Sequence, residues 1–288
     1  MASSSTALDR YAVLGNPVAH SRSPAIHAAF AAATGQRLSY ERVLVPMDGF
    51  EQTLRAFAAE GGKGCNVTVP FKFDAFRLCP RHTERAVLAE AANVVRFDAG
   101  GWWADNTDGV GLLTDIERNA GQPIAGQRVL LIGAGGASAG VLGPLLQAAP
   151  AEVVVANRTV ERAQALCSGH QPLATRHQVA LRASGLADAG AGFDIVLNAS
   201  ASSLAGDSAP VPASVLRPGT LVVDLMYGPA AAGFLRWAEA HGARTRDGLG
   251  MLVEQAAEAF ALWRGVRPAT APVLAMLREQ LAREATQP

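Results

Sequence analysis

Formal charge is scarce in this sequence, and neither sign is in excess. Only 17% of the 288 residues are charged, and 25 Lys and Arg residues balance 25 Asp and Glu residues, for a pI near 7.0. Proteins that bind nucleic acids or anionic membranes through their overall charge carry a basic excess. We therefore expect neither kind of partner, although a local site for a small anion is compatible with a neutral chain.

Long apolar runs and targeting segments are also missing. No apolar run approaches the ~18 residues that a membrane-spanning helix needs. The first residues do not combine a basic region with an apolar stretch, as a secretory signal does. We expect a cytoplasmic protein, with residues 1–9 forming a frayed tail.

Cysteines are few, and metal ligands are not clustered. The three cysteines, Cys65, Cys79 and Cys167, are an odd number and lie far apart, which favours reduced thiols. The six histidines include no pair at helical i, i+4 spacing, so we expect no metal site. Disorder is excluded because 49% of the residues are hydrophobic. The length suits one large domain or two of ordinary size.

Strand-like and helix-like segments alternate along almost the whole chain, which is typical of βα units. In the first part we predict strands at 11–14, 40–45, 65–69 and 94–97, with helices at 24–34, 49–60 and 83–91. In the second part we predict strands at 128–132, 153–156, 193–198 and 220–225, with helices at 109–119, 248–264 and 272–283. Ser23 as N-cap and Pro24 as first helical residue would start the first helix. The sequence therefore predicts an α/β protein of two domains, with a parallel sheet in the second.

One glycine-rich turn has the context of a dinucleotide-binding site. The turn consists of Gly133, Ala134, Gly135, Gly136 and Ala137, and it follows a predicted strand and opens an apolar helix. Glycine permits close approach of the backbone to a pyrophosphate, and the helix N-terminus supplies N–H groups for it. Ser138 stands where the usual fingerprint has its third glycine, and a tight strand-to-helix junction is the alternative explanation.

The end of the next predicted strand favours NADP(H) over NAD. An NAD site usually carries an acidic residue there for the ribose 2′-hydroxyl. Here the strand is followed by Asn157, Arg158 and Thr159, with Arg162 one turn later. Guanidinium groups suit a 2′-phosphate, and cations at a helix N-terminus are otherwise unfavourable. The alternative is a pair of solvated arginines.

Three further segments concentrate polar side chains. In segment 64–72, strand alternation places Asn66 and Thr68 on one face, opposite Cys65, Val67 and Val69, and Lys72 follows the strand. Segment 105–109 ends at a predicted helix start and contains Asp108, and segment 15–24 contains Ser21 and Ser23. Taken singly, Asp108 is typical of an N-cap and Lys72 of a surface lysine.

Together these motifs resemble those of the shikimate dehydrogenase family over about residues 10–280. The shared motifs, in chain order, are Gly-Asn-Pro-x-x-His-Ser-x-Ser-Pro, Asn-Val-Thr-Val-Pro-Phe-Lys, Asp-Asn-Thr-Asp-Gly, Gly-Ala-Gly-Gly-Ala, Asn-Arg-Thr and Asp-Gly-Leu-Gly-Met-Leu-Val-x-Gln-Ala. The resemblance implies reduction of 3-dehydroshikimate by NADPH in aromatic amino-acid synthesis. It also implies an N-terminal α/β substrate domain at 1–108, with 248–288 packing back on it, and a Rossmann-like NADP-binding domain at 109–247.

The resemblance also implies roles for individual residues. Lys72 and Asp108 match the catalytic pair, and Ser21 and Ser23 match the serines that bind the substrate carboxylate. The ring hydroxyls would be bound by Asn66, Thr68, Asn93, Asp108 and Gln255, with Tyr227 near the substrate. The cofactor would be bound by Gly133, Ala134, Gly135, Gly136, Ala137, Asn157, Arg158, Thr159 and Arg162, with Leu225 and Gly248 at the nicotinamide end and Glu84 near the cofactor.

Two other functions remain open at this stage. A relative that acts on quinate or an aminoshikimate would share most of these motifs. A catalytically silent NADPH-binding regulator would be expected to lack Lys72 or Asp108, and both are present. The sequence leaves open whether the protein is a monomer or a homodimer.

Overall fold

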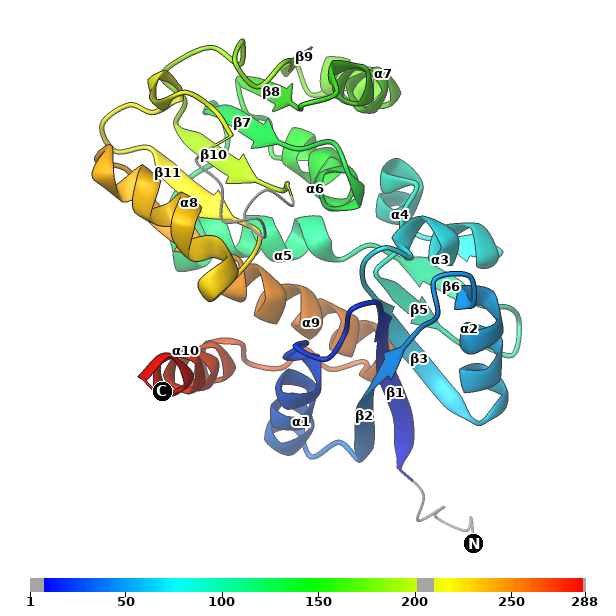
Figure 1. Ribbon diagram of the computed structural model, residues 1–288. Helices are drawn as coiled ribbons and strands as arrows, with labels where there is room; N and C mark the ends of the chain where they lie inside the picture. The colour runs from blue at the N-terminus through cyan, green and yellow to red at the C-terminus, as the bar shows by residue number, and fades with distance from the viewer. Residues whose placement is uncertain (1–7, 201–209, 287–288) are drawn as a thin grey trace, which may run out of the picture. The chain divides into compact units, whose positions relative to one another are not determined.

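The computed structural model describes residues 8–200 and 210–286, and the chain divides into two units (Figure 1). Unit 1 comprises the chain up to Thr107 together with Ala256–Leu277. Unit 2 comprises Asp108–Gln255 and the chain from Arg278 onward. The C-terminal segment 248–288 is therefore divided, and only its middle part belongs to unit 1. Each unit is built on its own six-stranded sheet.

The sheet of unit 1 has the strand order β2-β1-β3-β5-β6-β4. Its strands are β1 (Asp9–Gly15), β2 (Leu38–Leu44), β3 (Gly62–Val67), β4 (Arg81–His82), β5 (Val94–Arg96) and β6 (Trp103–Asp105). β1 is parallel to β2 and β3, β5 is antiparallel to β3 and β6, and β4 is parallel to β6. Leu14 is paired with Val67, so the C-terminal ends of the parallel strands β1 and β3 lie side by side. The polar segments that follow these two strands consequently start at one edge of the sheet.

Helices cover both faces of this sheet. They are α1 (Ser23–Thr34), α2 (Phe50–Ala59), α3 (Lys72–Leu78) and α4 (Glu84–Ala89), with the second part of α9 (Leu249–Arg264). Unit 1 also contains the first part of α10 (Ala271–Thr286). Side chains of β1 alternate between the faces. Leu14 joins a core with Leu54 of α2 and Ala75 of α3, whereas Tyr11 stacks on Trp263 of α9 with ring centroids 4.7 Å apart.

The sheet of unit 2 has the order β12-β11-β10-β7-β8-β9, and every pair is parallel, as the sequence predicts. Its strands are β7 (Arg128–Ile132), β8 (Glu152–Ala156), β9 (Ala180–Ser184), β10 (Ile195–Asn198), β11 (Leu221–Asp224) and β12 (Arg244–Asp247). This is the doubly wound order of dinucleotide-binding folds, and the order reverses between β7 and β10. Ligands of such sheets bind beyond the carboxyl ends of the strands at that reversal.

The helices of unit 2 are α5 (Asp108–Thr114), α6 (Gly136–Gln147), α7 (Val160–Arg176), α8 (Pro229–Ala240), the first part of α9 and the second part of α10. α5 packs on α6, α6 packs on α7, and α8 lies along β11 and β12 (Figure 1). The helix predicted at 109–119 changes to π-helical hydrogen bonding at Asp115–Asn119. A short 3-10 turn covers Ala213–Val215.

Three local predictions are corrected by the structure. Arg22 occupies the N-cap position of α1 and no side chain caps this helix, so the assignment of Ser23 as N-cap is wrong. The strand predicted to reach residue 69 ends at Val67, because the chain then turns, with the Phe71 N–H donating to the Thr68 carbonyl at 3.1 Å, and Val69 is exposed. Asp9, expected in the tail, begins β1. Leu8 precedes this strand and is exposed, and residues 1–7 of that tail lie outside the described residues.

The strands that the sequence analysis missed are short or lie at sheet edges. β9 and β12 are the edge strands of unit 2, and β12 reads Arg-Thr-Arg-Asp. Edge strands are partly solvated and tolerate charged side chains, so hydrophobic alternation does not reveal them. β4 and β6 contain two and three residues, too few to show a period.

Candidate active site

Two serine hydroxyls meet at the start of α1 in unit 1. The Ser21 hydroxyl donates to Ser23 Oγ at 3.2 Å, and the Ser23 backbone N–H donates to Ser21 Oγ at 3.3 Å. Arg42 holds this turn by donating from Nε and Nη2 to the Ser21 carbonyl, at 2.9 and 2.7 Å. The first N–H groups of a helix lack acceptors within the helix. Hydroxyls and N–H groups together make a local environment suited to a carboxylate.

The ends of β1 and β3 approach each other so closely that Gly15 has no room for a side chain. A Cβ at Gly15 would lie 2.3 Å from Thr68 Cγ2. The Thr68 N–H donates to the Leu14 carbonyl at 2.9 Å, which extends the pairing of the two strands by one residue. This contact places the half-buried Thr68 beside the turn that leads to the two serines.

A chain of hydrogen bonds fixes the two predicted amide side chains of unit 1. The Tyr40 hydroxyl donates to Asn66 Oδ1 at 2.6 Å, and Asn66 Nδ2 donates to the Asn93 carbonyl at 3.2 Å. The Thr107 N–H donates to Asn93 Oδ1 at 2.8 Å, and Asn93 Nδ2 donates to Thr107 Oγ1 at 3.0 Å. A backbone carbonyl only accepts and a backbone N–H only donates, so these partners determine which end of each amide is oxygen.

Burial keeps Tyr40 a hydrogen-bond donor. Its ring stacks on His27 with centroids 4.2 Å apart and an interplanar angle of 5°. Burial raises the pKa of Tyr40 well above its ordinary value, and burial lowers the pKa of His27 to about 3. At neutral pH the tyrosine is therefore protonated and the imidazole is uncharged.

The predicted catalytic residues occupy two helix starts, one in each unit. Lys72 is the first residue of α3, is half-buried, and accepts at its carbonyl from the Ala92 N–H at 2.9 Å. Asp108 is the first residue of α5 and is buried. Gln255 is also buried in unit 2, where its Nε2 donates to the Leu252 carbonyl at 3.1 Å. Tyr227 is half-buried in unit 2.

The glycine-rich turn of unit 2 lies at the reversal of strand order. Gly133 follows β7 with a φ of +109°, and a Cβ there would lie 3.1 Å from the carbonyl of Ala199, which follows β10. Gly135 is the N-cap of α6, so Gly136, Ala137 and Ser138 form its first turn. Ser138 is wholly buried. The bare backbone and the helix start fit a pyrophosphate.

Arg158 and Arg162 are exposed at the start of α7. Neither guanidinium forms an ion pair with a carboxylate in the part of the chain that the structure describes. Asn157 closes the turn before the helix, where its Nδ2 donates to the Thr159 carbonyl at 2.8 Å. Thr159 is the N-cap residue, and its exposed side chain makes no capping hydrogen bond. Two cations and a hydroxyl at a positive helix end fit an anionic ligand.

The remaining cofactor predictions fall in different places. A Cβ at Gly248 would lie 2.2 Å from the Leu225 carbonyl, and the Gly248 N–H donates to the Met226 carbonyl at 2.8 Å. Leu225 and Gly248 therefore meet beyond the ends of β11 and β12. Glu84 is exposed at the start of α4 in unit 1.

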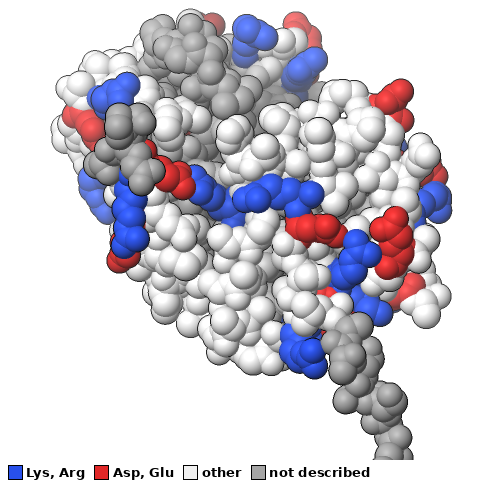
Figure 2. Space-filling view, turned by 60° about the horizontal axis from the view of Figure 1, so that its bottom comes forward, with Lys and Arg blue, Asp and Glu red and all other residues white. Residues whose placement is uncertain are grey.

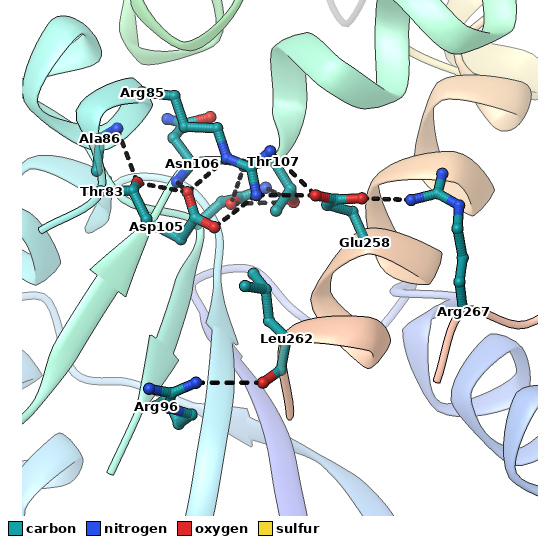
Figure 3. A network of polar contacts seen from close by, with 11 residues as sticks. Thr83, Arg85, Ala86, Arg96, Asp105, Asn106, Thr107, Glu258, Leu262 and Arg267 are labelled. Atoms are coloured by element: carbon teal, nitrogen blue, oxygen red, sulfur yellow. Dashed lines mark hydrogen bonds and ion pairs between the residues drawn. The ribbon is translucent and has the colours of Figure 1, made fainter. Parts of the chain in front are cut away.

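The structure also shows residues that sequence reasoning missed. Arg85 forms a polar network with Thr83, Glu258 and the buried Asp105, which is the first residue of the Asp-Asn-Thr-Asp-Gly motif (Figure 3). No sequence signal indicated Tyr40 or Arg85, because their partners are distant in the chain.

Other chemistries have less support. Burial raises the pKa of Cys79 to about 12 and of Cys167 to about 11, so neither is a thiolate near neutral pH. Among the described residues, no three His, Cys, Asp or Glu side chains are grouped as metal ligands would be. Over the same residues, no helix has the length and apolar character needed to cross a bilayer.

Family models match most of the chain. The model of the shikimate dehydrogenase substrate binding domain matches residues 13–95. The model of shikimate / quinate 5-dehydrogenase matches residues 115–224, and that of the shikimate 5′-dehydrogenase C-terminal domain matches residues 248–278.

Individual relatives cover nearly the full length. The shikimate dehydrogenase (NADP(+)) of Acidovorax sp. (strain JS42) is 62% identical over 276 residues, which are 96% of this chain and 98% of the relative. The crystal structure of an Ael1 enzyme from Pseudomonas putida has a TM-score of 0.85 and 50% identity, covering 93% of this chain and 98% of that one. The crystal structure of the shikimate 5-dehydrogenase from Thermus thermophilus in complex with NADP(H) and shikimate has a TM-score of 0.82 and 32% identity, covering 96% and 100%.

Proposed function

Since the chain belongs to the shikimate dehydrogenase family, we propose that it reduces 3-dehydroshikimate to shikimate reversibly with NADPH. The same chain combines a glycine turn and two exposed arginines, suited to a dinucleotide phosphate, with a serine pair and an ordered amide chain, suited to a hydroxylated carboxylate. We further propose that it acts in the aromatic amino-acid pathway as a cytoplasmic monomer or homodimer.

We assign substrate binding mainly to unit 1. Ser21 and Ser23 would bind the carboxylate, because two hydroxyls and a helix start are directed to one place. Asn66, Thr68 and Asn93 would bind ring hydroxyls, since the two amides have fixed donor and acceptor ends. Unit 2 would add Asp108, Tyr227 and Gln255 to this set.

We assign cofactor binding to unit 2. The turn Gly133–Ala137 would hold the pyrophosphate, and Asn157, Arg158, Thr159 and Arg162 would hold the ribose 2′-phosphate. Leu225 and Gly248 would lie at the nicotinamide end, and Glu84 of unit 1 remains a proposed neighbour of the cofactor. Bound NADPH supplies the hydride, and the protein supplies position and charge.

Lys72 and Asp108 would manage the proton. The Lys72 ammonium stabilises negative charge that develops on the substrate C3 oxygen and donates a proton to it from Nζ. In the oxidative direction, neutral Lys72 accepts that proton. Asp108 orients the lysine and accepts a hydrogen bond from a substrate hydroxyl. A general acid of this kind contributes about 10²–10⁴-fold to the rate.

The chain offers a matched test of this assignment, because Lys63 and Lys72 are its only lysines. Lys72→Ala should lower kcat by about 10²–10⁴-fold and leave the melting temperature within a few degrees. Lys63 is exposed, so Lys63→Ala should retain wild-type rates. Shikimate oxidation with NADP⁺ is the assay. Wild-type kcat in Lys72→Ala would contradict the assignment.

The same assay separates the alternatives. A quinate or aminoshikimate enzyme would show higher kcat/KM on those substrates than on shikimate. A silent regulator would bind NADPH and turn over none of the three. Either result in the wild-type protein would overturn the proposed substrate or the proposed activity.

A further inference from the structure

The end of β6 carries a carboxylate that is wholly buried and fully engaged. Asp105 Oδ1 accepts from Thr83 Oγ1 at 2.6 Å, from Arg85 Nε at 2.6 Å and from the Asn106 N–H at 2.7 Å. Asp105 Oδ2 accepts from Arg85 Nη2 at 2.6 Å (Figure 3). The two parallel bonds from the guanidinium fix the plane of the carboxylate. The turn that starts at Asn106 is thereby attached to α4.

The same guanidinium binds a second carboxylate on another element. Arg85 Nη1 and Nη2 both donate to Glu258 Oε1 of α9, each at 3.0 Å. Glu258 is also paired with Arg267 through its other oxygen. The positive charges of Arg85 and Arg267 therefore neutralise the negative charges of Asp105 and Glu258. Arg85 also joins the end of β6 to α9.

Both partners of Arg85 lie beside places where the chain passes from one unit to the other. The chain leaves unit 1 after Thr107, two residues beyond Asp105. It returns within α9 at Ala256, two residues before Glu258. Asp108 and Gln255 are the unit 2 residues at these two passages, and both are buried.

We propose that Arg85 is a positioning residue for Asp108 and Gln255. By binding Asp105 and Glu258 at once, Arg85 holds in place the two unit 1 segments to which Asp108 and Gln255 are joined. The inference rests on the proposed function, which gives Asp108 a catalytic role and Gln255 a substrate-binding role. A lysine cannot replace the arginine, because an ammonium lacks the planar fork that binds both carboxylates.

Arg96 provides a matched control in the same sheet. Its Nε and Nη2 bind Asp98 at 2.8–3.0 Å, and its Nη1 donates to the Leu262 carbonyl of α9 at 3.3 Å (Figure 3). Like Arg85, it joins a carboxylate to α9. Unlike Arg85, it forms no hydrogen bond with Asp105 or Glu258 among the described residues.

The experiment compares Arg85→Lys with Arg96→Lys in shikimate oxidation at a temperature where both are folded. Arg85→Lys should raise KM for shikimate and lower kcat, so that kcat/KM falls about 10–100-fold, with KM for NADP⁺ within about twofold of wild type. Arg96→Lys should keep kcat, KM for shikimate and KM for NADP⁺ within about twofold of wild type. Loss of folded enzyme alone would lower kcat and leave both KM values unchanged.

Equal constants in the two variants, or a fall in kcat alone, would overturn the proposal. If Arg85→Lys fails to fold, Glu258→Gln replaces it and Asp98→Asn replaces Arg96→Lys. KM for shikimate should then rise in Glu258→Gln and stay near wild type in Asp98→Asn. Asp108→Asn tests the underlying function separately. Full activity in Asp108→Asn refutes the role of Asp108, whereas an inactive Asp108→Asn with equal Arg85→Lys and Arg96→Lys refutes only the role of Arg85.

Discussion

Single residues in unit 1 owe their chemical roles to partners that fix their orientation. Asn66 is an acceptor toward Tyr40 and a donor toward Asn93, so the remaining N–H and lone pair of its amide have fixed directions. An asparagine without such partners could present either end to a ligand. The hydroxyl of Tyr40 therefore orients Asn66, a proposed substrate ligand, although Tyr40 lies in β2, outside every recognised motif.

Tyr40→Phe tests that statement directly. The variant leaves Asn66 Oδ1 without its donor, and loss of one hydrogen bond in a buried network costs about 1–3 kcal/mol. We expect KM for shikimate to rise about 5–100-fold, with KM for NADP⁺ unchanged. Tyr11→Phe is the control, since Tyr11 and Tyr40 both lie against the Trp263 ring but the Tyr11 hydroxyl accepts from Arg264. Equal KM values in the two variants would contradict the prediction.

His27 makes stability depend on pH. Burial lowers its pKa to about 3 in the folded protein, against 6.5 for an exposed histidine. Below pH 6.5 the unfolded chain binds a proton that the folded chain does not, so stability falls as pH falls toward 3. Between pH 6.5 and 5 the loss from this group is about 2 kcal/mol.

Urea unfolding at pH 7.5 and 5.0 measures this effect. His27→Phe should lose about 2 kcal/mol less stability than wild type over that range. The exposed His241 supplies the control, and His241→Phe should keep the wild-type pH dependence. Identical slopes in wild type and His27→Phe would show that another group is responsible.

At the scale of elements, close approach of backbones sets several positions that sequence motifs mark as glycine. Gly109 follows Asp108 in the Asn-Thr-Asp-Gly motif and lies where α5 crosses α6. A Cβ there would be 2.4 Å from Pro144 Cγ and 2.8 Å from the Gly140 carbonyl. Neither the proline ring nor the helix backbone can move aside without shifting α6.

Gly109→Ala should therefore destabilise the protein by about 1–3 kcal/mol, as expected for overpacking. Gly233 of α8 is the matched control, because no atom of the described residues, apart from its chain neighbours and the backbone of its own helix, lies within 4 Å of a Cβ placed there. Gly233→Ala should be neutral or stabilising by up to about 1 kcal/mol. Thermal or urea unfolding of both variants gives the comparison, and a stable Gly109→Ala protein would show that α5 and α6 can separate at low cost.

For the whole molecule, the formal charge is zero, and the proposed ligands are anions. On the face shown in Figure 2, acidic side chains lie close to the basic ones, with uncharged surface between the groups. Long-range attraction by net charge is therefore weak. Binding of an anion must depend on a few local donors, of which Arg158 and Arg162 are the charged members proposed in unit 2.

The preference for NADPH should consequently depend on these arginines. Charge-assisted hydrogen bonds contribute about 1.5–3 kcal/mol each, so we expect wild type to favour NADPH over NADH by at least about 10²-fold in kcat/KM. Arg158→Gln should lower kcat/KM for NADPH about tenfold or more and leave that for NADH nearly unchanged. Arg176→Gln, at the opposite end of α7, should change neither. Equal use of both cofactors by wild type would refute the 2′-phosphate site.

The sequence by itself determined the fold class, the parallel sheet of unit 2, the family and the cofactor. These follow from apolar periodicity and from motifs of three to ten residues, whose geometry is set by neighbours in the chain. The correction at Ser23 shows the limit of such reasoning. A Ser-Pro pair is typical of a helix start, but the hydroxyl of this serine binds Ser21 instead of capping α1.

Only the tertiary structure decided which side chains orient the proposed site. Tyr40 reaches Asn66 across 26 residues and Arg85 reaches Glu258 across 173, and no local pattern encodes such pairs. The physical reason is that these hydrogen bonds form between elements that the sheet and α9 bring together. Their energies depend on burial, which exists only after the chain has folded.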